Sequence, residues 1–80
     1  MRDRASTVRL GIPNAGRVQV TIHDVAGRKV RRLADRVFPA GEHVLTWDGA
    51  DDDGRAVARG VYFVRSSTQK DAGRIIVLNR

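Results

Sequence analysis

The sequence predicts an all-β fold, a small antiparallel β-sandwich of about six or seven strands. Apolar residues alternate with polar ones at the period of two that half-buried strands show, not at the helical period of about 3.6. Glycine, proline, asparagine and aspartate interrupt these segments at intervals of roughly 8 to 15 residues. A chain of 80 residues forms one domain and buries only about 60% of its unfolded surface, so the core must be small.

The first two strands are expected on either side of a turn at residues 13–16, Pro-Asn-Ala-Gly. Alternation places three apolar residues of each strand on the inward face: Val8, Leu10 and Ile12, then Val18, Val20 and Ile22. Asp24 and Gly27 bound the next turn, because an aspartate binds nearby main-chain amides and a glycine adopts positive φ at little cost.

The middle of the chain is harder to interpret. Residues 29–38 have an irregular pattern that fits a short helix or a bent strand, and we favour a strand with a bulge. A turn at residues 39–42 follows. The next strand is expected to direct Leu45 and Trp47 inward, with His43 at the edge of the same face.

The strand after the acidic turn is expected at residues 61–66, with Tyr62 and Val64 inward and Phe63 on the other face. Residues 67–73 are polar and predict a loop. Residues 74–79 are expected to form the last strand, and four consecutive apolar residues in it indicate a central or core strand.

No apolar run approaches the roughly 20 residues needed to span a bilayer, and no export-signal pattern follows Met1. If the domain works outside the cytoplasm, the signal must belong to a longer polypeptide, and Met1 is then an internal or artificial start. We expect residues 1–4 to be a disordered remnant, residues 5–80 to form the sandwich, and the loop around Gln69 to be disordered as well.

The net charge of +6 comes almost entirely from arginine, since Lys29 and Lys70 are the only lysines. Such a charge fits an acidic partner such as nucleic acid or anionic glycolipid. It also fits solvated sheet faces, which we favour because the arginines are scattered along every segment and no aromatic residue lies among them to stack on bases. No nucleic-acid partner is expected.

An acidic turn is the obvious candidate for a metal, because its carboxylates could supply several of the oxygens that calcium prefers: Asp48, Asp51, Asp52 and Asp53. The alternating spacing of an EF-hand loop is absent. Consecutive aspartates beside glycines more often bind main-chain amides, so we expect a structural turn and no metal, with calcium at residues 51–53 as the alternative.

Candidate catalytic residues are few. The histidines, His23 and His43, have no cysteine to help them hold zinc, and we interpret both as sheet-edge residues. No serine stands in a G-x-S-x-G motif, which is typical of one class of Ser/His hydrolase. The sequence therefore predicts a protein that is not an enzyme and that needs no cofactor.

Trp47 has two interpretations. It could stack on sugars, as in carbohydrate-binding modules of sandwich fold, or it could anchor the core. Alternation places it with Leu45 on the inward face, and a lone tryptophan in a small sandwich is usually a core residue. We favour the core, and a stand-alone adhesin or carbohydrate-binding module stays open as an alternative function.

A combination of turn and aromatic residues extends from about Val8 to the end of the chain. Its positions are Pro13, Asp24, Gly27, Gly41, the run Trp47, Asp48 and Gly49, then Gly54, Gly60 with Tyr62, and a last strand from Arg74 to Arg80. This combination resembles one family, the small immunoglobulin-like domains of the flagellar hook-capping protein and of type IX secretion cargo. The resemblance implies an immunoglobulin-like β-sandwich.

The resemblance implies two functions. As a type IX sorting domain, which we favour, the chain would direct a cargo protein fused at its N-terminal side through the outer-membrane secretion machinery to the cell surface. Gly60, Tyr62, Arg74 and Arg80 would then match positions linked to sorting, and the domain would be secreted or surface-attached as the C-terminal part of a longer protein. As a hook-capping module, the alternative, it would belong to a scaffold that guides hook assembly.

Overall fold

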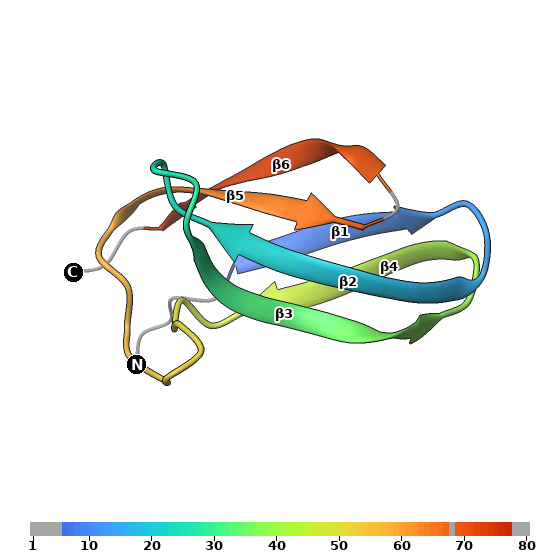
Figure 1. Ribbon diagram of the computed structural model, residues 1–80, viewed down its shortest axis with the longest axis horizontal. Helices are drawn as coiled ribbons and strands as arrows, with labels where there is room; N and C mark the ends of the chain where they lie inside the picture. Colours follow the sequence, from blue (N-terminus) through green and yellow to red (C-terminus); the bar gives the residue numbers. More distant parts are fainter. Residues whose placement is uncertain (1–5, 68, 78–80) are drawn as a thin grey trace.

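The computed structural model describes residues 6–67 and 69–77, with side chains described for residues 6–67. It contains six strands in this part of the chain (Figure 1): β1 Ser6–Ile12, β2 Gly16–His23, β3 Lys29–Phe38, β4 Gly41–Trp47, β5 Gly60–Ser66 and β6 Gln69–Val77. The predictions of disorder for residues 1–4 and of a sorting role for Arg80 fall outside these residues. No helix in the described ranges has the length and apolarity that a membrane span requires.

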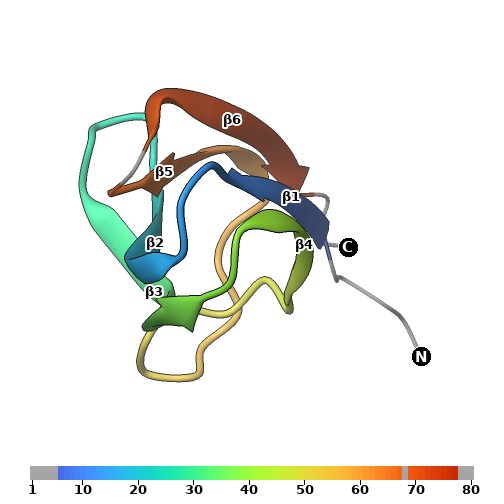
Figure 2. The same cartoon turned by 90° about the vertical axis from the view of Figure 1, so that its right-hand side faces the viewer.

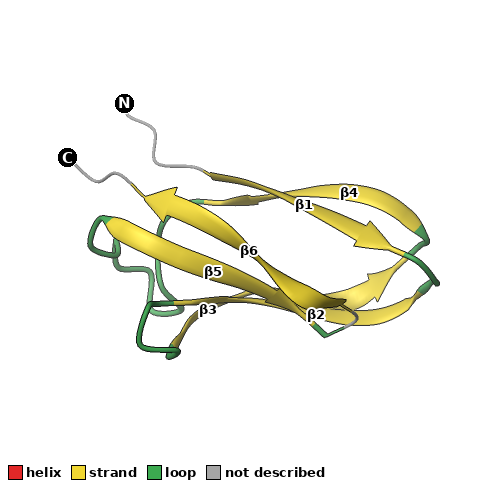
Figure 3. Cartoon of the chain, turned by 90° about the horizontal axis from the view of Figure 1, so that it is seen from above, coloured by secondary structure: helices red, strands yellow, loops and turns green. Residues whose placement is uncertain are grey.

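The strands form two antiparallel sheets that face each other (Figure 3). One sheet pairs β1 with β4, and the other has the order β3-β2-β5-β6. Seen along the strands, the larger sheet curves around the β1–β4 pair (Figure 2). The expected all-β, immunoglobulin-like sandwich is confirmed, because strands joined in sequence by short turns close on one another across the two layers.

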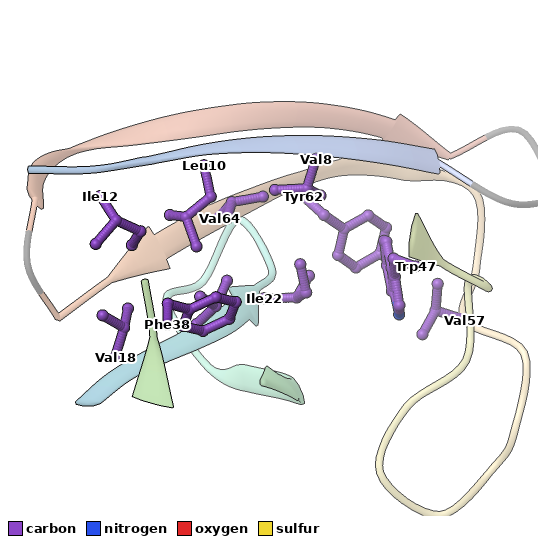
Figure 4. Packing of buried hydrophobic residues seen from close by; sticks show 11 residues of the cluster. Val8, Leu10, Ile12, Val18, Ile22, Phe38, Trp47, Val57, Tyr62 and Val64 are labelled. Atoms are coloured by element: carbon purple, nitrogen blue, oxygen red, sulfur yellow. The ribbon is translucent and has the colours of Figure 1, made fainter. Parts of the chain in front are cut away.

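The core lies between the sheets (Figure 4). It consists of eleven buried apolar residues: Val8, Leu10, Ile12, Val18, Val20, Ile22, Phe38, Trp47, Val57, Tyr62 and Val64. The two inward rows expected on β1 and β2 are confirmed in full, because side chains two residues apart on a strand share a face. Val57 lies in the connection between β4 and β5 and covers the core at the end near Trp47.

The irregular segment is one long strand, β3, with two register shifts against β2. Val20 pairs with Ala34 and Thr21 with Arg32, so that Leu33 is the extra residue of a bulge. A second shift occurs where Ile22 and His23 pair with residues two positions apart on β3. The bulges explain the broken alternation and confirm the interpretation as a bulged strand.

The C-terminal part of the fold differs from expectation in two ways. Residues 67–73 do not form a long polar loop, because β6 begins at Gln69 and pairs with β5 from Ser66 to Gly60. The predicted final strand is therefore present in residues 74–77 but starts earlier. It is also an edge strand of the larger sheet and not a central one. Contacts between β6 and β1 of the other sheet are consistent with its apolar run.

Candidate functional site

Two loops at one end of the sandwich share a five-residue pattern, Asp-x-x-Gly-Arg. The first, residues 24–28, joins β2 to β3, and the second, residues 51–55, lies between β4 and β5. Reading the sequence for longer repeats misses this pattern, although the spacing of aspartate, glycine and arginine is a signal that could have found it. We call them the first and second Asp-Gly-Arg loops.

In the first loop, Asp24 organises its own turn. Its Oδ1 accepts hydrogen bonds from the main-chain N–H groups of Ala26 at 3.0 Å and Arg28 at 2.9 Å. The main chain closes the same ring, because Asp24 N–H donates to Arg28 O at 3.0 Å and Gly27 N–H donates to Asp24 O at 2.9 Å. Gly27 has a φ of 87°, a conformation that residues with a side chain rarely adopt.

The second loop repeats this geometry. Oδ1 of Asp51 accepts from the N–H groups of Asp53 at 2.9 Å and Arg55 at 3.0 Å. Asp51 N–H donates to Arg55 O at 2.8 Å, Gly54 N–H donates to Asp51 O at 3.0 Å, and the φ of Gly54 is 86°. Two loops far apart in sequence thus adopt one conformation because each has an aspartate acceptor and a glycine at the same spacing.

The two loops enclose an open pocket of about 370 Å³ at this end of the molecule. Its lining residues come from both loops, from the start of β3 and from the segment after the second loop: Asp24, Arg28, Lys29, Val30, Asp51, Asp52, Asp53 and Val57. Charges of both signs face one another there. Arg28 Nε lies 3.1 Å from Asp24 Oδ2 and forms an ion pair with it. The ammonium group of Lys29 has no ion-pair partner among the described residues.

The second loop is tied to the core by its carbonyl groups. Ala50 O accepts from the indole N–H of Trp47 at 2.8 Å and from Nη1 of Arg31 at 3.1 Å. The same Arg31 nitrogen donates to Asp51 O at 3.2 Å and lies 3.4 Å from Oδ1 of Asp48. A half-buried arginine on β3 therefore fixes the start of the second loop, in the connection that follows β4.

Asp52 covers the outer edge of β3. Its main-chain N–H donates to Val30 O at 3.1 Å, and its Oδ1 accepts from Arg32 N–H at 2.9 Å. β3 is an edge strand, so its outward main-chain groups have no neighbouring strand to bind. Asp52 satisfies two of them, the carbonyl of Val30 and the N–H of Arg32. The second loop thus closes part of the edge to other strands.

The hydrogen bonds bear on calcium binding at the acidic turn. One carboxylate oxygen of Asp48 and one of Asp52 each accept a hydrogen bond from a main-chain N–H. One carboxylate oxygen of Asp51 accepts hydrogen bonds from two main-chain N–H groups. No cluster of three or more candidate metal ligands occurs within the described chain. The bonds support a structural role for the turn.

Trp47 and Tyr62 form the aromatic centre of this end of the core. Trp47 is 0% exposed, and its ring packs edge-to-face on Tyr62 with centroids 5.4 Å apart. The hydroxyl of Tyr62 donates to Ala58 O at 2.7 Å, four residues upstream, as in the tyrosine corner of immunoglobulin-like domains. A fully buried indole offers no platform for a sugar, so the carbohydrate-binding alternative loses its main feature.

The other positions of the resemblance lie in turns or at strand ends. Pro13 is in the bend between β1 and β2, and Gly41 and Gly60 begin β4 and β5. Gly49 follows Asp48 directly after β4, and Gly49 O accepts from Val57 N–H at 2.9 Å. Arg74 pairs with Phe63 in the β5–β6 ladder. The structure does not bring these residues together in one site.

The histidines occupy different positions. His43 faces inward opposite Leu10 on β1, and its ring packs edge-to-face on Phe38 at 5.2 Å. His23 ends β2, which lies between β3 and β5, so the expectation of a sheet-edge residue is wrong for it. Its Nε2 is 2.9 Å from Oγ1 of Thr21 and its Nδ1 is 3.3 Å from Gly27 O.

Two groups at this end have displaced pKa values. The hydrogen bond from Arg28 N–H is the largest cause that lowers the pKa of Asp24 below its usual value. Desolvation opposes it, while the charge of Arg28 and the N–H of Ala26 add to it. Burial raises the pKa of the Tyr62 hydroxyl, and the negative charge of Asp24 raises it further.

Comparison with known proteins decides the family. A profile of the FlgD Ig-like domain matches residues 3–72. The chain belongs to the FlgD Ig-like domain family. The basal-body rod modification protein FlgD of Salmonella typhimurium (strain LT2) is 36% identical over 62 residues, which are 78% of this chain and 27% of that protein. The FlgD protein of Salmonella typhi gives the same values.

Membership in the FlgD Ig-like domain family corrects two expectations. The preferred function, type IX sorting, is wrong, because the matching family and both relatives are flagellar. The expected location, at the cell surface as the C-terminal part of an exported cargo protein, is wrong for the same reason. Tyr62 illustrates the cause of the error, since it is 8% exposed and its hydroxyl is bound internally.

The part of the resemblance that pointed to the flagellar hook-capping protein is confirmed. The chain is not an enzyme, as members of this family are immunoglobulin-like structural modules. It spans about a quarter of the length of the FlgD relatives it matches, 27%. The expected partners, a fused cargo and the outer-membrane secretion machinery, are tested by none of these comparisons.

Proposed function

We propose that this chain is a non-catalytic immunoglobulin-like module of a FlgD-type scaffold that acts in assembly of the flagellar rod and hook. The observation that carries the proposal is the match to the FlgD Ig-like domain over residues 3–72. The aligned relatives are named for the modification of the basal-body rod, which places those proteins in flagellar construction.

The geometry supports a role as a rigid module. Several residues that carry the family resemblance maintain the fold itself. Asp24, Gly27 and Gly54 form turns closed by internal hydrogen bonds, and Trp47 and Tyr62 pack on each other and donate to main-chain carbonyls. Such residues maintain shape, so recognition of flagellar proteins would fall to exposed side chains on the sheet faces. We propose that the partners are subunits of the growing rod or hook.

A domain replacement tests the proposal. The segment of Salmonella typhimurium FlgD that aligns with this chain is exchanged for the whole chain, so that β6 is complete, and swimming in soft agar and hooks on purified basal bodies are scored. The expected result is motility and hook formation above those of a strain carrying an unrelated immunoglobulin-like domain of equal length. A folded, stably produced chimaera that supports neither motility nor hooks any better than that control overturns the proposal.

A further inference from the structure

The outer face of the larger sheet is hollowed where β2 pairs with β5. Two adjoining pockets of about 260 Å³ each lie on this face and share two residues, His23 and Arg65. One continues to Val25 and Phe63, and the other to Gln19 and Ser67. Together they form a continuous depression across the ladder, which we call the β2–β5 groove. Its lining includes Gln19, Thr21, His23, Asp24, Val25, Phe63 and Arg65, with Ser67 at one end.

The middle of the groove is cationic. Thr21 lies opposite Arg65 on β5 and opposite Arg32 on β3, and residues paired across a ladder share a face, so two exposed arginines flank it. His23 likewise pairs with Lys29 on β3. Within the described residues, the side chains of Arg32, Arg65 and Lys29 have no ion-pair partner. Among the described residues, two arginines without an ion pair thus flank Thr21, and Lys29 lies in the next row, beside the pocket of the two Asp-Gly-Arg loops.

Two carboxylates near the groove, those of Asp35 and Asp24, each have a cationic partner. Asp35 lies 3.1 Å from Nε of Arg17 and also accepts from the Gln19 side chain at 3.4 Å. Asp24, which lines the groove, is paired with Arg28 at 3.1 Å. An anion placed over Thr21 would therefore meet two exposed arginines, and no uncompensated negative charge from these two carboxylates.

One end of the groove is apolar. Val25 is 75% exposed at the tip of the first Asp-Gly-Arg loop, and the half-buried ring of Phe63 lines the same pocket. The imidazole ring of His23 is fixed in the groove because both of its ring nitrogens have hydrogen-bond partners, Thr21 Oγ1 and Gly27 O. The groove thus combines a fixed polar floor, cationic walls and an apolar end.

We propose that the β2–β5 groove docks an acidic peptide segment of a partner protein, with carboxylates against Arg65 and Arg32 and one apolar side chain against Val25 and Phe63. Charge complementarity favours this occupant, because guanidinium groups bind carboxylates in bidentate geometry. Nucleic acid fits less well, since the single aromatic ring of the groove, Phe63, is half-buried and offers no row of stacking surfaces. The inference goes beyond the proposed scaffold function and holds whichever flagellar protein supplies the segment.

The test uses the whole chain and a fluorescein-labelled probe peptide in which glutamates surround one central leucine. Two control peptides have lysine in place of glutamate, or serine in place of leucine. Fluorescence anisotropy is measured at about 0.15 M ionic strength, where long-range attraction is largely screened. Saturable binding of the glutamate peptide with a Kd below about 1 mM is expected, with weaker binding of the serine peptide and none of the lysine peptide.

Matched variants locate the binding surface. Arg65→Glu should weaken binding at least about tenfold, because it replaces an attraction in the groove by a repulsion. Arg9→Glu makes the same charge change on the exposed face of β1, in the other sheet, and should change binding less than about twofold. Circular dichroism spectra and melting temperatures of both variants should match the parent chain, since both side chains are exposed.

Three outcomes overturn the proposal: no saturable binding of the glutamate peptide, equal weakening by the two variants, or tighter binding of an oligothymidine strand than of the peptide. The second would show general attraction to a basic protein, and the third would show a nucleic-acid surface. None of these results bears on the domain replacement in FlgD, so the two proposals fail separately.

Discussion

Replacing Asp51 by alanine should destabilise the domain far more than replacing Asp53 in the same loop. Oδ1 of Asp51 accepts two main-chain N–H groups at 2.9 and 3.0 Å, whereas the side chain of Asp53 has no hydrogen-bond partner among the described residues. Hydrogen bonds to a charged acceptor contribute roughly 1.5 kcal/mol each, and water replaces part of this at a half-exposed loop, so the expected loss is about 2 kcal/mol. Asp53→Ala should change the free energy of unfolding by less than about 0.5 kcal/mol.

Urea unfolding followed by Trp47 fluorescence measures both changes, because the buried indole becomes exposed on unfolding. With an m value of about 1 kcal/mol/M for a chain of this size, the midpoint for Asp51→Ala should fall by about 2 M. Asp51→Asn keeps a neutral acceptor and should lose about half as much free energy. Equal midpoints for Asp51→Ala and Asp53→Ala would refute the argument that the carboxylate of Asp51 holds the loop.

Three further changes test other parts of the structure. Trp47→Ala should cost about 3 to 5 kcal/mol or unfold the domain, which calorimetry would show as a lower or absent transition, and an unchanged melting temperature would contradict the burial of the indole. Tyr62→Phe removes the bond to Ala58 O and should cost about 1 kcal/mol at neutral pH. Because folding raises the pKa of Tyr62, its stabilisation is complete below the unfolded value of about 10 and is lost as pH rises through the folded value. The phenylalanine variant should lack this alkaline loss in a series of melting temperatures. Folding lowers the pKa of Asp24, so its contribution is present above the unfolded value of about 3.9 and is lost as pH falls through the folded one. Asp24→Asn should flatten the acid side of the same series, and an unchanged acid slope would show that Asp24 does not contribute.

The strands near the N-terminus illustrate what alternation predicts well. From Val8 on β1 and from Val18 on β2, every second residue is apolar and buried, because the pleat sends successive side chains to opposite faces. On β3 the same rule fails at Leu33, where a bulge shifts the register, and the sequence could only offer a bent strand as one of two interpretations.

The end of the chain shows the opposite case. Four consecutive apolar residues predicted a central or core strand. β6 is an edge strand of its sheet, but it contacts β1 of the other sheet. A continuous apolar run indicates that both faces of a strand are buried, but it does not indicate which strands or sheets bury them. Position within a sheet is decided by the pairing of distant segments.

The functional error has a similar origin. Glycines, the Trp47-Asp48-Gly49 run and Tyr62 serve the sandwich itself, so a pattern built on them identifies the fold without distinguishing the uses of that fold. The match to the FlgD Ig-like domain over residues 3–72 separated the two uses. The β2–β5 groove is lined by a different set of residues. Alternation predicts only that these residues lie on an outer face of the sheet.

The sequence alone determined the all-β class, the inward rows and the turn at Asp24, because these depend on neighbours within a few residues. Only the tertiary structure decided that the two Asp-Gly-Arg loops enclose one pocket, that Asp52 covers the edge of β3, and that Arg32 and Arg65 flank Thr21. These groups are brought together by strand pairing over long separations. Their juxtaposition follows from register and sheet order, which local alternation does not encode.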